Sequence, residues 1–148
     1  MARTPPAWLR TAGYWFLAFE FSVGFVTKFW SGPTFFGPAY SEKFVEWGFS
    51  PNMRFVVGAL ELLAAVLFVI PRRQTRFFAA AMLVFVLDAA TTVHITNPDP
   101  VGAGISAPLH LMIMLVLVAV NWPADWRDVV PLPMSRARKS EHAVSRGV

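Results

Sequence analysis

Four apolar segments, each close to the length that crosses a bilayer, constrain this chain more than any other feature. They cover residues 12–29, 52–70, 76–95 and 106–122. A helix rises about 1.5 Å per residue, so about 20 apolar residues cross a hydrocarbon core roughly 30 Å thick. The segments predict an all-α integral membrane protein, in which residues 1–122 form an antiparallel bundle of four transmembrane helices.

The composition argues against several other classes of protein. Hydrophobic residues make up 55% of the chain and charged residues 15%, too little charge to cover the surface of a soluble helical bundle. The sequence contains no cysteine, which excludes disulfides, thiolate metal sites and iron–sulfur clusters within it. The net charge of +4 comes from basic residues grouped beside apolar segments. Such grouping does not favour nucleic acid as a partner.

The distribution of lysine and arginine predicts an orientation. One side of the membrane would hold Arg3, Arg10, Arg72, Arg73, Arg76, Arg127, Arg136, Arg138, Lys139 and Arg146. The other side would hold Lys28, Lys43 and Arg54. Because cytoplasmic loops carry the excess of basic residues, both termini are expected in the cytoplasm. Residues 123–148 then form a disordered basic cytoplasmic tail, and residues 40–48 a short interfacial helix in the first outer loop.

Ionisable and polar side chains within the apolar segments are the candidate functional residues. They are Glu20, Lys28, Arg54, Glu61, Asp88, Thr91, His94 and His110. One central Asp costs about 2.5–3.5 kcal/mol of insertion free energy, whereas each large aliphatic residue contributes about 0.3–0.6 kcal/mol. Asp88 is therefore expected to face the bundle interior, to be protonated or to have a partner, and residues of this kind usually mark a function.

The expected depths place these residues in a funnel that opens on the outer side and ends near the midplane. We predict that Glu61, Glu20 and Asp88 exchange protons in a catalytic role. We predict that the others bind a ligand, and they are His94, His110, Lys28, Arg54 and Thr91. The alternative is that pairs such as Arg54–Glu61 or Lys28–Glu20 only fix the register of the helices.

Neither a metal nor haem is favoured by the spacing of possible ligands. No apolar segment carries His-x-x-x-His or Glu-x-x-His, which would place two metal ligands on one helix face. His94 and His110 could ligate haem from adjacent helices, but that signal is unspecific. The fourteen phenylalanines are compatible with an aromatic-lined pocket for a flat ligand, and a quinone is the cofactor considered.

Two short motifs combine a glycine with an ionisable residue. Gly24-x-x-x-Lys28 ends the first apolar segment, and Gly58-x-x-Glu61 lies in the second. Pro71-Arg72 follows, and the third segment ends near His94. In this order and spacing, residues 14–122 resemble the DoxX-like family of small bacterial membrane proteins.

The resemblance implies a four-helix bundle in the bacterial inner membrane. It also implies, for some members, an association with quinone-linked sulfur oxidation or with redox-stress complexes. The long first outer loop, Asp88 and the basic tail depart from a typical member.

Three functions are compatible with these observations. The leading hypothesis is a membrane protein that binds a lipophilic small molecule, a quinone-like redox partner, in an outer-half polar pocket. The second is a membrane-embedded acid–base enzyme, a cyclase or isomerase acting on an isoprenoid-type substrate. The third is a non-catalytic accessory subunit of a membrane complex. Expected partners are membrane lipids, the small molecule, and a second copy or another membrane subunit.

Overall fold

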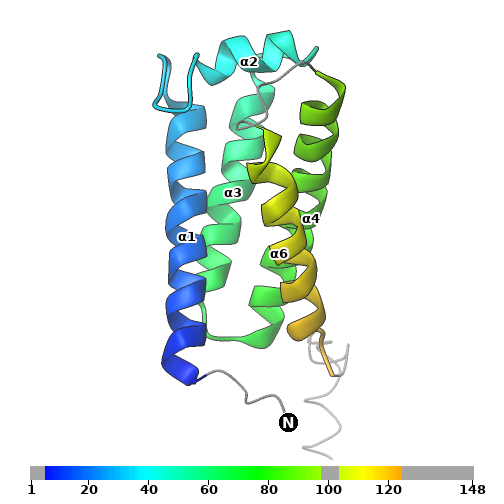
Figure 1. Ribbon diagram of the computed structural model, residues 1–148. Helices are drawn as coiled ribbons and strands as arrows, with labels where there is room; N and C mark the ends of the chain where they lie inside the picture. Colours follow the sequence, from blue (N-terminus) through cyan, green and yellow to red (C-terminus); the bar gives the residue numbers. More distant parts are fainter. Residues whose placement is uncertain (1–5, 98–103, 125–148) are drawn as a thin grey trace, which may run out of the picture.

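The computed structural model describes residues 6–97 and 104–124, and these residues form helices with short connections (Figure 1). The helices are α1 (Ala7–Phe29), α2 (Tyr40–Glu46), α3 (Met53–Val69), α4 (Arg73–Thr96) and α6 (Ser106–Val120). This confirms the predicted all-α class for the described part of the chain. The predicted tail lies outside the described residues except for Pro123 and Ala124.

The four longer described helices stand side by side, and α2 lies across one end of them (Figure 1). Helix α1 packs mainly on α3, α3 on α4, and α4 on α6. The backbones of α1 and α6 approach each other less closely than these neighbours do. We call the end that α2 covers the α2 end. The opposite end, where Pro71 joins α3 to α4, is the turn end.

The short helix α2 ends in a glycine turn that follows from its sequence. Gly48 has a φ of +82°, and its N–H donates to the Val45 carbonyl at 2.9 Å. The Phe49 N–H donates to the Phe44 carbonyl at 2.8 Å, and the two phenylalanine rings lie 6.2 Å apart. This is the Schellman arrangement, which satisfies the last carbonyls of a helix and favours glycine. The turn directs the chain from α2 into α3.

The apolar core lies mainly in the turn half of the bundle. It consists of Tyr14, Leu17, Ala18, Phe21, Ala64, Ala65, Phe68, Ala79, Ala80, Leu83, Leu87 and Met114. Five alanines in this set keep the helices close, and Phe68, Leu83 and Met114 fill the space between them. Close packing in this half holds the helices that carry the polar residues of the other half.

The predicted four spans are confirmed only as an all-helical bundle. Among the described helices, α4 is the one long and apolar enough to cross a membrane, and α6 is apolar but has 15 residues. Helix α3 has 17 residues. Helix α1 has 23 residues but carries Arg10, Glu20 and Lys28. The charged residues of α1 and the short lengths of α3 and α6 therefore distinguish these three helices from α4 as candidate membrane spans.

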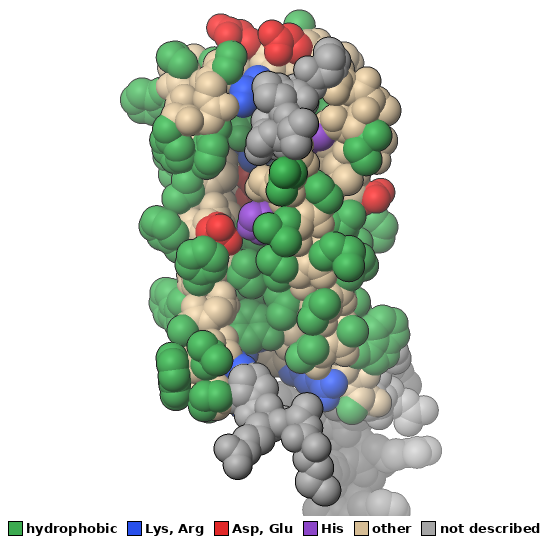
Figure 2. Space-filling model, in the orientation of Figure 1, with side chains coloured by type: hydrophobic (Ala, Val, Ile, Leu, Met, Phe, Trp, Pro, Cys, Tyr) green, Lys and Arg blue, Asp and Glu red, His purple; other side chains and the backbone are tan. Residues whose placement is uncertain are grey.

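Large hydrophobic side chains cover the outside of the bundle. Figure 2 shows apolar side chains along its whole length, with charged side chains gathered mainly at the two ends and a few acidic ones between them. Phe19 of α1 is 67% exposed, and Phe85 of α4 is 78% exposed. An exposed apolar surface of this extent is unusual for a soluble monomer.

Candidate functional site

A buried ion pair joins α1 to α3 in the α2 half of the bundle. The Lys28 Nζ donates a hydrogen bond to the Glu61 Oε1 at 2.8 Å, and the two side chains are 11% and 10% exposed. The second oxygen, Glu61 Oε2, is buried and accepts no hydrogen bond from the described residues. A buried carboxylate oxygen without a donor is costly. The site therefore contains one unused acceptor.

Two glycines allow the helices to approach closely enough for this pair. A Cβ atom added to Gly24 would lie 2.8 Å from the Glu61 Oε2. A Cβ atom added to Gly58 would lie 3.1 Å from a ring carbon of Phe29 and 3.3 Å from the Lys28 Cβ. The glycine on each helix thus makes room for the side chains of the other, as small residues do between membrane helices. This arrangement explains why both motifs combine a glycine with a charge.

Arg54 and Tyr40 cover the ion pair at the α2 end. The Arg54 Nη1 donates to the carbonyls of Lys28 and Trp30, at 3.0 and 2.7 Å. These carbonyls belong to the end of α1, where helical donors run out. The Tyr40 ring centroid lies 4.8 Å from the Lys28 Nζ, within the range of a cation–π contact. The Arg54 Nε is buried and has no acceptor among the described residues, so the site also contains an unused donor.

The pairings considered from the sequence alone, Arg54–Glu61 and Lys28–Glu20, are wrong. Arg54 binds main-chain carbonyls, and Lys28 pairs with Glu61. Glu20 and Lys28 are eight residues apart, which separates them by about 80° around a helix. Lys28 therefore faces α3, whereas Glu20 faces α6.

A second polar pair crosses the wider gap between α1 and α6. The Glu20 Oε2 lies 3.3 Å from the His110 Nε2, and the two side chains are 33% and 20% exposed. The His110 Nδ1 lies 2.8 Å from the Ser106 carbonyl, which can only accept, so Nδ1 donates to it. The contact with Glu20 then requires one further proton, either on Nε2 or on the carboxyl group.

The other predicted residues lie outside these two pairs. Asp88 is exposed on α4, so of the three alternatives for this residue the position in the bundle interior is wrong. The Thr91 hydroxyl donates to the Leu87 carbonyl of its own helix at 2.7 Å. The His94 ring packs edge-on against the Trp47 ring of the segment that follows α2, with centroids 5.2 Å apart.

A polar cluster at the turn end was not predicted from the sequence. The Asn121 Nδ2 donates to the Tyr14 hydroxyl at 2.8 Å, and the hydroxyl is 3.2 Å from the Asn121 Oδ1. The Arg76 guanidinium lies 3.8 Å from the Tyr14 ring centroid. The only signal was the presence of a tyrosine in the first apolar segment and an asparagine at the end of the fourth. The cluster ties α1 to α4 and to the residue that follows α6.

The two polar pairs and Arg54 offer a cation, a carboxylate, an imidazole, an unused donor and an unused acceptor. These groups can bind carbonyl and hydroxyl oxygens or move protons between them. Among residues 6–97 and 104–124, no group of three or more His, Cys, Asp or Glu residues could hold a metal ion.

Comparison with known proteins identifies the family. A search of curated proteins and of solved structures returned no match. The family model for the DoxX-like family matches residues 11–120, which include most of α1 and all of α2, α3, α4 and α6. Both glycine motifs and both polar pairs lie within the match, and the chain belongs to the DoxX-like family.

Proposed function

We propose that the bundle is embedded in the bacterial inner membrane, with α1, α3, α4 and α6 as its four spans. The α2 end faces outward and the turn end faces the cytoplasm, as the basic residues there favour. The apolar outer surface of the bundle supports this placement, because lipid is the solvent that such a surface matches. Short spans such as α6 are accommodated by local thinning of the bilayer.

The absence of cysteine makes the proposed orientation directly testable. In intact spheroplasts, Glu42→Cys on α2 should react with a membrane-impermeant maleimide. Arg73→Cys at the start of α4 should react only after lysis. Labelling of both positions from outside, or of neither, would contradict the orientation.

Within this bundle we propose that the Lys28–Glu61 site binds a quinone-like lipophilic molecule. The supporting observation is that the Glu61 Oε2 and the Arg54 Nε are both buried and unused. A quinone carbonyl needs a donor, and the hydroxyl of the reduced form needs an acceptor. A ligand that reached both atoms could bind in either oxidation state.

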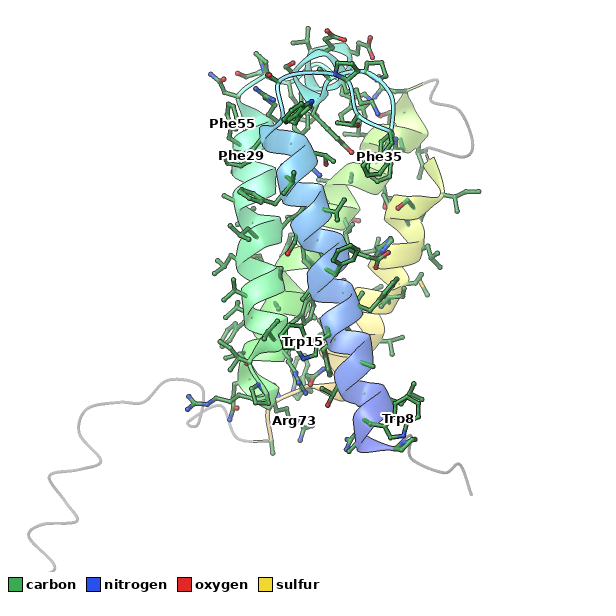
Figure 3. All side chains as sticks on the ribbon, turned by 90° about the vertical axis from the view of Figure 1, so that its left-hand side faces the viewer. Trp8, Trp15, Phe29, Phe35, Phe55 and Arg73 are labelled. Carbon is green, nitrogen blue, oxygen red and sulfur yellow. The ribbon has the colours of Figure 1, made fainter. Side chains whose placement is uncertain are left out.

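The surroundings of the site suit a flat apolar ring. The Phe29 ring lies 4.9 Å from the Phe55 ring and 4.6 Å from the Phe25 ring, measured between centroids. Figure 3 shows Phe29 and Phe55 together at the α2 end, opposite Trp8 and Arg73. Aromatic walls with a few polar groups are typical of small-molecule sites. The Glu20–His110 pair would exchange the protons that accompany a change of oxidation state.

The test is co-purification followed by titration. Protein purified in mild detergent is analysed by native mass spectrometry and absorbance, and a short-chain benzoquinone is then titrated against tryptophan fluorescence. The wild type should carry or bind a quinone, and Glu61→Gln should weaken binding at least tenfold. The matched control is Glu42→Gln, which changes an exposed carboxylate on α2 and should bind as the wild type does.

The result depends on the variants being folded, which helix content and elution volume report. If Glu61→Gln misfolds, Arg54→Lys provides the second variant, because lysine lacks the Nε–H donor while it retains the charge. Wild-type protein that neither carries nor binds a quinone would contradict the proposal and leave the accessory-subunit hypothesis in the lead.

A second candidate function rests on the Glu20–His110 pair. A shared proton beside an apolar interior is what an acid–base cyclase or isomerase would need for an isoprenoid-type substrate. Glu20→Gln distinguishes the two functions. It should abolish turnover of such a substrate while binding persists, whereas a quinone site at Lys28–Glu61 should remain occupied.

A further inference from the structure

A groove runs between α1 and α3 on the outside of the bundle, mainly in its turn half. It has a volume of about 270 Å³ and is lined almost entirely by apolar side chains. Trp15 and Phe19 form one wall, Val66 and Val69 the other, and Ala18 lies between them. The walls are exposed on the outside of the bundle, with Trp15 at 57% and Val66 at 53%. The groove is therefore open to whatever surrounds the bundle.

Two exposed arginines follow the last lining residue of this groove in the chain, at the turn end of the bundle. Val69 lines the groove, and Arg72 and Arg73 follow three and four residues later in the chain. Both arginines are exposed, and neither side chain has a hydrogen-bond or ion-pair partner in the described structure. Figure 3 shows Trp15 between α1 and α3, and Arg73 at the same end of the bundle.

We propose that this groove binds one anionic phospholipid of the inner leaflet. An acyl chain lies between α1 and α3, and the headgroup phosphate accepts hydrogen bonds from Arg72 and Arg73. Guanidinium groups match phosphate oxygens in charge and geometry. Trp15 lies beside the acyl chain just below the headgroup region, a depth at which tryptophan is favoured. The inference rests on the membrane placement proposed above, but not on the identity of the ligand at Lys28–Glu61.

The charge of the groove end decides between the possible occupants. A zwitterionic lipid or a helix of a second copy would fill the apolar part equally well. A helix would offer the two arginines no anion, and a zwitterionic headgroup would offer a phosphate whose charge its own ammonium group offsets. An anionic headgroup attached to an acyl chain satisfies both parts at once.

The test is native mass spectrometry of the full chain in detergent, titrated with phosphatidylglycerol or with phosphatidylethanolamine of the same acyl chains. Wild-type protein should retain phosphatidylglycerol more tightly. The double change Arg72→Gln and Arg73→Gln should weaken phosphatidylglycerol binding on the order of fivefold for each arginine. It should weaken phosphatidylethanolamine binding less, because the ammonium group of that lipid offsets the charge of its phosphate.

The groove itself is tested by Ser22→Leu, which places a larger side chain on its lining without changing the core set. This variant should weaken binding of both lipids. If it fails to fold, Val66→Phe on the exposed wall serves the same purpose.

Matched controls separate a defined site from general attraction to lipid. Arg10→Gln removes an exposed arginine five residues before Trp15, about 140° around α1. Val116→Leu enlarges an exposed side chain on α6, away from the groove. Both should bind lipid as the wild type does.

Three outcomes would overturn the proposal. One is that the double arginine variant behaves like Arg10→Gln, and another is that the groove variants behave like Val116→Leu. The third is a lipid-free dimer that the groove variants abolish, because a second copy would then occupy the groove. The maleimide experiment is independent: correct labelling together with unchanged lipid binding would reject the lipid site alone.

Discussion

The two halves of the bundle are held together in different ways. In the turn half, Phe68 and Leu83 are fully buried among alanines, and side-chain volume decides the packing. In the α2 half, the central contact between α1 and α3 is an ion pair that two glycines accommodate. A chain that needed only a stable bundle could continue the apolar packing to both ends.

The difference indicates a division of roles. A buried ion pair adds little net stability compared with apolar residues of the same volume, but it strongly penalises any arrangement that separates the charges. The turn half therefore supplies the stability, and the α2 half keeps buried charged groups at fixed positions. The proposed ligand site and the proposed lipid groove follow this division, since the first uses buried polar atoms and the second an exposed apolar surface.

Removing one member of the ion pair should have the largest effect on stability. We expect Lys28→Met to lower the free energy of unfolding in detergent by about 3–5 kcal/mol, because the Glu61 carboxylate is left buried without a cation. The double variant Lys28→Met with Glu61→Leu should recover most of that loss. Chemical denaturation followed by circular dichroism measures both. A double variant as unstable as the single one would mean that the ion pair is itself a main source of stability.

A cavity in the turn half should have a slightly smaller effect. Phe68→Ala is expected to lower the free energy of unfolding by about 2–4 kcal/mol, because the substitution leaves a cavity in the core. The loss is smaller than in a water-soluble protein, because in a lipid-like solvent part of the free energy of transferring the ring out of water is absent. The matched control is Phe85→Ala on α4, where the ring is 78% exposed and little should change. Equal effects at the two positions would show that the described core does not hold this half together.

The helical architecture could be predicted from the sequence because it depends on local hydrophobicity. The apolar segments and Pro71 set the positions of the longer helices within a few residues. The pairing of charges could not be predicted in the same way. Glu61 was named as a candidate site residue, but its partner depends on how α1 and α3 are rotated, and hydropathy does not fix that rotation.

Asp88 illustrates the same limit of prediction from the sequence. Its cost in a membrane helix suggested a position in the interior, yet the residue faces outward because Leu83 and Leu87 take the inner face of α4. The Tyr14–Asn121 contact was missed because its two residues lie 107 positions apart and neither is ionisable near neutral pH. Tertiary packing decided both cases.

A methyl group at Gly24 should have an intermediate effect. The new Cβ would lie 2.8 Å from the Glu61 Oε2, so Gly24→Ala must displace the carboxylate or part the helices. We expect a loss of about 1–3 kcal/mol in the free energy of unfolding, as for other overpacked sites. Gly13→Ala is the matched control within α1. Nothing lies within 4 Å of its Cβ position, and alanine favours the helix, so stability should be unchanged or slightly higher.

The smallest effect on the free energy of unfolding is expected for Asp88→Asn. This variant tests whether the two halves of the bundle are stable without a partner protein. In a single copy the side chain is exposed on α4, so Asp88→Asn should change the free energy of unfolding in detergent by no more than about 0.5 kcal/mol. In a bilayer the same change should favour insertion, because a charged side chain facing lipid costs more than an amide. The measurement is therefore made twice, by denaturation in detergent and by the yield of membrane-inserted protein.

A loss above about 1 kcal/mol in detergent would show that Asp88 has a partner outside the single chain, since measured hydrogen bonds to charged groups reach that size. Stability of the α2 half would then depend on an assembly, and the comparison between the halves would have to include that partner.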